Sequence, residues 1–427
     1  MVSTILLLMG GLLFFFEQVG LMFSFFLLGV YFVLFGVFGG GFDYSVWNLE
    51  VSFIGVGMLF LVGVIMMSLV MWAGSGGMPS GLLIMSMGIV MAGFFVVDSW
   101  LWFYIMYEGV VLPLVLVVLV LGAYYERVSS CLYLLIYTVL FSTPLLVGVL
   151  VGVSLGELIW VSWWGYSMSG IWGIWGFIIS LAMLVKIPIY GLHGWLPKVH
   201  VEAPTWGSIV LAGVVIKLGL YGLFVLSNSG LLGCVFWGVG VWAMIGGCLA
   251  GLYCLVVGDV KALVAYSSVV HMSSVVWLFS FGGSGVWRGF LLVALMHGLV
   301  SATFFGCVGY LGESLKSRSV SVFKGVLSFY SGMGLLMVII LVFNMGFPVS
   351  GGFLGELEVF WVLLCLYPLG LFLVGVYMLV GCGFNLGLGV VMSGGHSHVD
   401  VGLKESLIMW SLLGLSVLYL GASSVLL

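Results

Sequence analysis

Charged residues are scarce in this chain. Of its 427 residues only 6% are charged, as 14 Asp and Glu and 10 Lys and Arg, whereas 64% are hydrophobic. Soluble domains carry about 25% charged residues, so this chain lacks the polar surface that a water-soluble fold requires. The composition excludes a soluble enzyme, a nucleic-acid-binding protein and a disordered chain.

Regular alternation of polar and apolar residues is also absent, which excludes a transmembrane β-barrel. Long apolar runs such as Phe53–Val70 and Leu132–Val153 take its place. Since about 20 residues cross a bilayer as a helix, the sequence predicts an all-α polytopic membrane protein with about 14 transmembrane helices. The expected spans are 2–16, 20–38, 52–73, 81–97, 100–122, 131–153, 170–190, 203–226, 231–257, 260–280, 287–311, 326–366, 369–392 and 403–422.

Closely spaced cysteine ligands are missing as well. The seven cysteines include no C-x-x-C pair, and all lie in or beside apolar stretches. Iron–sulfur and zinc sites need closer spacing, so we expect these thiols to be packing residues. The segment His396–Asp400 has the composition of a metal cluster, but its position in a short loop argues against one. We therefore expect no cofactor, metal or redox centre in this chain.

Two prolines interrupt predicted spans. Pro188 lies within 170–190, and Pro348 lies within 326–366, which is too long for one straight helix. Two broken helices five spans apart are typical of the inverted repeats of transporter-like folds, although either proline alone is also compatible with a tolerated kink. The predicted organisation is N-terminal helices in 1–80, a first five-helix repeat in 81–226, an inverted second repeat in 227–392 and a C-terminal helix in 393–427.

The cations are distributed unevenly between the two predicted sides. Loops on one side hold seven of them, whereas the other side holds Arg288 alone. By the positive-inside rule, the cation-rich side faces the cytoplasm or, in an organelle, the matrix. A bias toward residues with G- and T-rich codons favours an organellar genome. The seven cations are Arg127, Lys198, Lys261, Lys316, Arg318, Lys324 and Lys404.

Four charged residues fall inside predicted spans, namely Glu108, Lys186, Lys217 and Glu356. A charge at the bilayer centre costs about 2.5–3.5 kcal/mol, so a functional role is favoured. Glu108 and Lys186 have opposite charge and are expected to pair in a cavity; a static ion pair that fixes helix register is the alternative. For Lys217 the alternative is a side chain that extends to the surface. Glu358 should face away from Glu356, because residues two apart on a helix point in different directions.

Histidines form the second candidate set. Imidazole both accepts and donates protons near neutral pH, which suits a proton relay, although a hydrogen-bonded packing histidine is an equal alternative for each. Two of them lie between Lys217 and Glu356 in chain order, which would match a lateral path. The four candidates are His193, His200, His271 and His297.

The segment Lys186–Pro204 closely resembles the signature of the antiporter-like membrane subunits of respiratory complex I. The resemblance extends over roughly residues 100–360. Its further parts are Tyr107–Gly109 with Pro113, Lys217–Gly222, Asp259–Met272 and His297–Leu299. Most relatives carry lysine in the broken twelfth helix, whereas Glu356 occupies this position here.

The resemblance implies 14 core helices with two inverted repeats, and a function in proton translocation. It implies that Glu108 and Lys186 form the coupled pair, that Lys217 is the central relay, and that Glu356 is the terminal residue. The histidines His271 and His297 would connect them, with His193 and His200 as further candidate relay residues.

The resemblance also implies a setting. The chain would be a multi-pass subunit of the mitochondrial inner membrane, beside other membrane-arm subunits, neighbouring antiporter-like subunits and lipids such as cardiolipin, with no nucleic acid. NADH, FMN, iron–sulfur clusters and ubiquinone would be bound elsewhere in the complex. An Mrp-type cation/proton antiporter subunit and a scaffold with inactive buried charges remain the alternatives.

Overall fold

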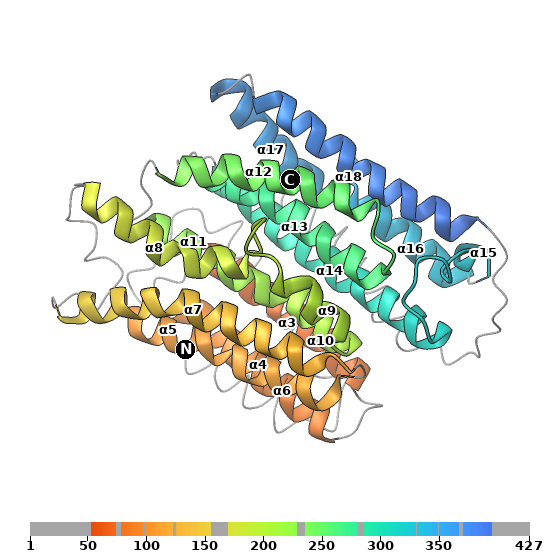
Figure 1. Cartoon of the computed structure of the whole chain (residues 1–427), viewed down its shortest axis with the longest axis horizontal. Coiled ribbons are helices and arrows are strands. Elements are labelled where there is room, and N and C mark those ends of the chain that lie inside the picture. Colours follow the sequence, from red (N-terminus) through yellow and green to blue (C-terminus); the bar gives the residue numbers. More distant parts are fainter. Residues whose placement is uncertain are drawn as a thin grey trace.

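The computed structural model contains helices throughout the part of the chain that it describes (Figure 1). A bilayer offers no hydrogen-bond partners, so apolar segments satisfy their backbone groups internally as helices. Within the described residues, seven helices are long and apolar enough to span a membrane, and four shorter apolar helices accompany them. The described residues are 53–73, 78–97, 99–122, 125–154, 170–228, 235–280, 286–329, 331–348, 350–366 and 370–394.

The described helices form two groups along the chain. The first group is α3 (Phe53–Ala73), α4 (Met78–Val96), α5 (Trp100–Gly109), α6 (Val111–Leu121), α7 (Arg127–Ser154), α8 (Gly170–Lys186), α9 (Trp195–Glu202) and α10 (Thr205–Val210). The π-helical turn η3 (Leu211–Val215) then leads into α11 (Ile216–Asn228). The second group is α12 (Val235–Cys254), α13 (Val260–Phe279), α14 (Val286–Leu315), α15 (Val326–Phe329), α16 (Ser331–Asn344), α17 (Gly351–Leu366) and α18 (Gly370–Ser393).

The predicted all-helical membrane architecture is confirmed, with one span divided differently. The span expected at 100–122 consists of α5 and α6, which meet at Val110. Pro113 has no N–H group to donate to the Gly109 carbonyl, which explains the interruption. The expected spans 2–16, 20–38 and 403–422, and the candidate segment His396–Asp400, lie outside the described residues.

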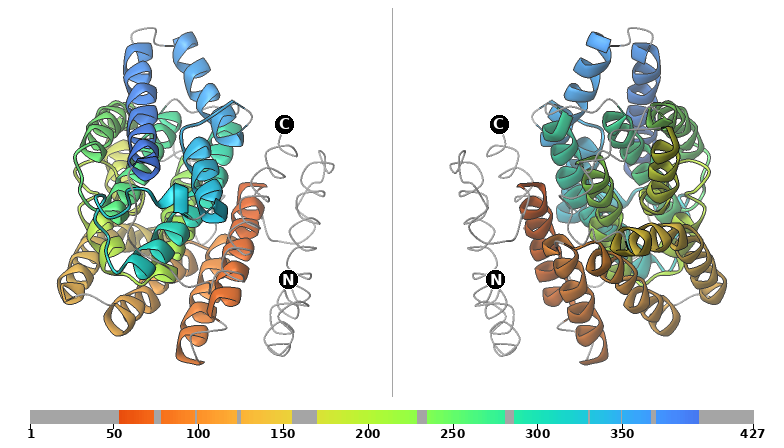
Figure 2. Two further views of the ribbon diagram at one scale, coloured as in Figure 1. Left: turned by 90° about the vertical axis from the view of Figure 1, so that its right-hand side faces the viewer. Right: turned by 90° about the vertical axis from the view of Figure 1, so that its left-hand side faces the viewer.

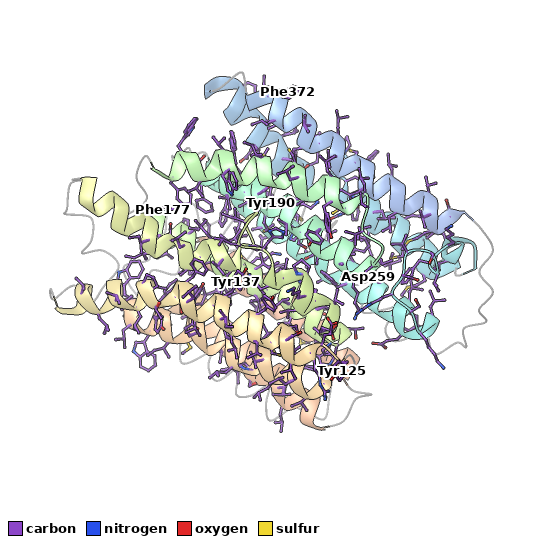
Figure 3. The ribbon with its side chains drawn as sticks, in the orientation of Figure 1. Tyr125, Tyr137, Phe177, Tyr190, Asp259 and Phe372 are labelled. Carbon is purple, nitrogen blue, oxygen red and sulfur yellow. The ribbon has the colours of Figure 1, made fainter. Side chains whose placement is uncertain are left out.

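The buried helices lie in the middle of the bundle. Figures 1 and 2 show α17 and α18 at one edge and α4–α7 at the other, with α13 and α14 between them. Residues 289–309 of α14 are all buried. The edge helices carry exposed apolar side chains, such as Phe372 of α18 in Figure 3, as expected for surfaces that face lipid or other subunits.

The first predicted break is confirmed at Pro188. Helix α8 ends at Lys186, and a turn with Gly191 at φ +97° leads into α9. The break leaves the Val185 carbonyl without its helical donor, and the Trp195 indole N–H donates to this oxygen at 2.9 Å. The Trp195 side chain therefore stabilises an opening in the helix, next to Lys186.

The second predicted break is confirmed before Pro348. Helix α16 ends at Asn344 and α17 begins at Gly351, with Gly346 at φ +68° between them. The Ser350 hydroxyl accepts a hydrogen bond from the Phe353 N–H at 3.2 Å and so caps α17. This second opening lies next to Glu356.

Candidate functional site

Lys217 lies at the centre of the bundle and is fully buried. It lies two residues after the π-helical turn η3, and its Nζ donates to the Ala212 carbonyl, five residues earlier, at 2.7 Å. A π-helical turn shifts the register of the backbone, as often seen at functional sites. The same Nζ lies 2.9 Å from Nδ1 of His297 on α14. The alternative that Lys217 extends to the surface is therefore wrong.

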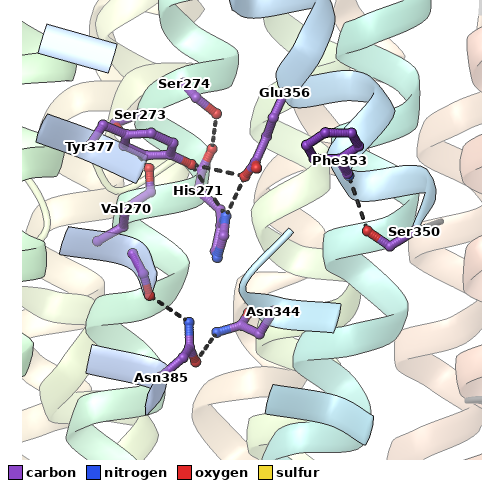
Figure 4. Close-up of polar contacts among 11 residues, drawn as sticks. Val270, His271, Ser273, Ser274, Asn344, Ser350, Phe353, Glu356, Tyr377 and Asn385 are labelled. Atoms are coloured by element: carbon purple, nitrogen blue, oxygen red, sulfur yellow. Dashed lines mark hydrogen bonds and ion pairs between the residues drawn. The ribbon is translucent and has the colours of Figure 1, made fainter. Parts of the chain in front are cut away.

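His297 leads to a second cluster on α13, α17 and α18. The rings of His297 and His271 lie 5.5 Å apart between centroids. His271 Nδ1 is 3.3 Å from Glu356 Oε1, and the Tyr377 hydroxyl donates to the same oxygen at 3.2 Å (Figure 4). All of these side chains are buried. The structure therefore places Lys217, His297, His271 and Glu356 in one series; we call this series the polar row. Both histidines lie between Lys217 and Glu356, as expected, but in the reverse of their chain order.

Lys186 contacts Tyr107 rather than Glu108. Its Nζ donates to the Tyr107 carbonyl at 2.6 Å and lies 3.2 Å from the centre of the Tyr107 ring. The Tyr107 hydroxyl in turn donates to the Ala182 carbonyl of α8 at 2.6 Å. Within the described residues, no ion pair joins Glu108 and Lys186, and the buried Glu108 Oε1 has no hydrogen-bond partner. The two charges therefore lie near each other without direct contact, separated by Tyr107.

His193 and His200 have different surroundings. His193 Nδ1 accepts a hydrogen bond from the Gly191 N–H at 3.1 Å, and its ring stacks on Tyr190, so it belongs to the turn at the first break. His200 is fully buried and stacks on Phe305 of α14 at 4.2 Å between centroids. Neither ring nitrogen of His200 has a hydrogen-bond partner within the described residues. His200 is therefore the better relay candidate of the two.

Glu356 and Glu358 point in different directions, as their spacing predicts. Glu356 contacts His271 and Tyr377, whereas Glu358 packs over Gly289 of α14. The structure also adds Tyr377 to the cluster, which the sequence interpretation missed. A tyrosine in an apolar span carries no signal of its own, because its partners come from other helices.

A buried amide pair lies beside the same cluster. Asn344 Nδ2 donates to Asn385 Oδ1 at 2.9 Å, which links the end of α16 to α18 (Figure 4). Asn385 lies two helical turns beyond Tyr377, on the same face of α18. The hydrogen bond between the two amides therefore attaches the end of α16, where the second break begins, to α18.

Gly346 offers a test of the second break. Its φ of +68° is unfavourable for other residues by about 1–2 kcal/mol, and an added Cβ would meet the Glu356 carboxylate. We expect Gly346→Ala to displace Glu356 and to lower the thermal stability of the protein, which a thermal-unfolding measurement would show. Gly387→Ala is the matched control, because a Cβ there meets no atom within 4 Å. Equal behaviour of the two variants would contradict this account.

Metal ligands do not cluster in the described part of the chain, which contains no group of three or more His, Cys, Asp or Glu placed to hold an ion. Five cysteines are free thiols. Cys382 is half-buried, and the other four are buried: Cys131, Cys248, Cys254 and Cys307. These thiols fit the expected packing role.

Comparison with known proteins identifies a matching family and similar sequences. The sequence profile of the family described as "NADH:quinone oxidoreductase/Mrp antiporter, TM" matches residues 97–380. The chain is 31% identical over 329 residues to NADH-ubiquinone oxidoreductase chain 4 of Albinaria caerulea, covering 74% of this chain and 73% of that protein.

Two solved structures share the fold. A chain in the archaeal membrane-bound sulfane sulfur reductase (MBS) has a TM-score of 0.80 at 17% identity, covering 95% of this chain and 88% of that one. A chain in the Mrp complex from Dietzia sp. DQ12-45-1b has a TM-score of 0.78 at 15% identity, covering 87% of this chain and 80% of that one.

Proposed function

Because the chain belongs to the NADH:quinone oxidoreductase/Mrp antiporter family, we propose that it is a proton-translocating membrane-arm subunit of NADH:ubiquinone oxidoreductase, of the chain 4 type. The observation that carries this proposal is the polar row from Lys217 to Glu356. Its members are buried and connected, although each would be cheaper as an apolar residue in this environment.

The polar row has the geometry for stepwise proton transfer. Transfer needs donor and acceptor atoms at hydrogen-bond distance, directly or through one water. The 2.9 Å contact from Lys217 to His297 and the 3.3 Å contact from His271 to Glu356 meet this condition directly. Between the two imidazole rings, one water is sufficient. His271 Nε2, which is buried and has no hydrogen-bond partner among the described residues, is available to it.

Energy reaches the row as a change in charge at Glu108 on α5 and Lys186 on α8, which are not members of the row. Redox chemistry takes place elsewhere in the complex, where NADH, FMN, iron–sulfur clusters and ubiquinone bind, and perturbs the field at Glu108 and Lys186. Moving one charge against 100 mV needs about 2.3 kcal/mol, and a change of one in pKa corresponds to about 1.4 kcal/mol. A change of two in the pKa of one buried group is therefore sufficient.

The two helix breaks support an arrangement of two inverted five-helix repeats within 14 transmembrane helices. Protons enter from the cation-rich side, which is the matrix, and leave near Glu356. The protein lies in the mitochondrial inner membrane, next to other membrane-arm subunits and lipids such as cardiolipin.

The test uses Glu108→Ala and Lys186→Ala in the intact complex. We expect either change to abolish or severely reduce proton pumping while the assembled complex stays detectable, because the charge that drives the row is removed. The ratio of protons to electrons in membrane vesicles is the measurement. Lys324→Ala, which removes an exposed lysine, is the control. A normal ratio in both test variants would defeat the mechanism and favour a scaffold.

An Mrp-type cation/proton antiporter is the second candidate, favoured by the fold that the chain shares with the Mrp complex. The two functions differ in their energy source. Proton movement in vesicles driven by an imposed cation gradient, without NADH or quinone, would support the antiporter.

A further inference from the structure

A charged cluster joins three segments at the end of the bundle where several of the predicted cation-side residues lie. Arg318 lies 3.7 Å from Glu202, the last residue of α9, and 3.6 Å from Asp259, which precedes α13 (Asp259 is labelled in Figure 3). The backbone of the Arg318 segment is paired with the segment before α13, since Val260 N–H donates to the Arg318 carbonyl at 2.9 Å and Val320 N–H donates to Gly258 at 2.8 Å. The position of Arg318 is therefore fixed by two carboxylates at its side chain and by hydrogen bonds of its backbone segment.

The three charged residues line a cavity of about 610 Å³. The exposed side chains of Glu126 and Lys198 lie on the same cavity wall. The lining therefore contains three carboxylates and two cations. This balance favours the collection of protons over the binding of an anionic lipid headgroup or a phosphate.

Glu202 differs from the other carboxylates of the cavity because its side chain is only 6% exposed. Its Oε1 faces Arg318, whereas its Oε2 is buried and has no hydrogen-bond partner in the described structure. Burial raises the pKa of the Glu202 carboxyl, and the Arg318 guanidinium opposes this rise. One oxygen of Glu202 is thus positioned by Arg318 while the other is available to take up a proton.

His200 connects this cluster to the polar row. It lies on the same short helix as Glu202, and its ring stacks on Phe305 of α14. Phe305 is eight residues beyond His297 on α14, which corresponds to about 12 Å along a helix. His200 also lies within electrostatic range of Lys217. It is therefore a buried imidazole, with both ring nitrogens unpartnered among the described residues, on the helix that carries Glu202 and within the field of Lys217.

We propose that Glu202 is the proton-uptake group of this subunit, that Arg318 and Asp259 position it, and that His200 passes the proton inward toward Lys217. Glu202 Oε2 accepts a proton from water in the cavity, releases it through water to a ring nitrogen of His200, and returns to the carboxylate. This inference rests on the proposed function and adds the route by which protons enter.

The test is Glu202→Gln in the complete complex, in membrane vesicles whose cation-rich side faces the medium. Loss of the acid should slow NADH-driven generation of membrane potential by about tenfold or more, as for loss of a proton-transfer group. Acetate in the medium should restore much of the rate, because a small weak acid in the cavity replaces the missing carboxyl. Membrane potential is the readout, since a permeant weak acid does not dissipate it. Glu313→Gln, which removes an exposed carboxyl of α14 that does not line this cavity, is the matched control and should behave as the wild type, with no response to acetate.

Lys217→Met, measured in parallel, separates this inference from the proposed function. If Lys217→Met is inactive while Glu202→Gln keeps its full rate, the uptake route is wrong and the proposed function stands. If both variants keep their full rate, the proposed function fails. A slow Glu202→Gln that acetate does not restore, or that only added anionic lipid restores, overturns the uptake role. If Glu202→Gln does not assemble, Glu202→Ala takes its place, because the shorter side chain leaves room for acetate; a slow rate that acetate does not restore again overturns the inference.

Discussion

Lys217→Arg should stop proton translocation through this subunit although it preserves the positive charge. Arginine does not release its proton in proteins, so an arginine at this position keeps the electrostatics of the row but cannot pass a proton to His297. Lys217→Met, which removes both the charge and the proton, should be equally inactive. A fall of about a hundredfold in proton transfer is the scale expected when a positioned acid–base group is lost.

The comparison of these two variants tells a relay apart from a structural cation. If Lys217 only balanced charge or fixed helix register, arginine would be tolerated and methionine would not. The measurement is the number of protons moved per NADH oxidised in vesicles, with the amount of assembled complex determined separately. Lys198→Arg is the control, because Lys198 is exposed and lies over the Tyr133 ring, away from the polar row. Full pumping by Lys217→Arg would exclude the relay role.

The helix breaks and the intramembrane charges were predictable because each has a local cause. Pro188 and Pro348 remove backbone donors wherever they occur, and the structure breaks at both. A buried charge is costly in any membrane fold, so Lys217 and Glu356 could be singled out without a structure. The helical period alone separated Glu356 from Glu358, as the structure confirms.

Contacts between helices could not be predicted in the same way, because they depend on rotations that the sequence does not encode locally. Tyr107 precedes Glu108 in the chain, yet its carbonyl and ring contact Lys186, while the Glu108 carboxylate does not. Tyr377 lies in an apolar span like many other tyrosines, and only the packing of α18 against α13 and α17 brings it to Glu356.

The π-helical turn before Lys217 is a further feature that the sequence did not predict. The residues Leu211–Val215 are small or apolar and fit an α-helix equally well. The wider turn places the Ala212 carbonyl within reach of Lys217 Nζ, which gives the ammonium a partner deep in the membrane. A local conformation thus fixes the position of Lys217, the first residue of the polar row.

Glu356→Gln should block the terminal step of the row while the protein still assembles. Glutamine keeps the size of the side chain and can still accept the hydrogen bond from Tyr377, so the packing of α17 against α18 is preserved. It cannot bind and release a proton near neutral pH, and transfer from His271 then has no acceptor. We expect proton pumping to fall by about a hundredfold, the scale for loss of an acid–base group.

Two further variants make the Glu356 result specific. Glu358→Gln removes a carboxyl two residues away that faces Gly289 instead of His271, and it should pump normally. Tyr377→Phe deletes one hydrogen bond to Glu356, an interaction with a charged group that contributes about 1.5–3 kcal/mol, and should give an intermediate rate. Vesicle assays of pumping on equal amounts of assembled complex give the order of rates. If Glu358→Gln lost pumping and Glu356→Gln did not, the terminal proton acceptor would be Glu358, and the polar row as described would be wrong.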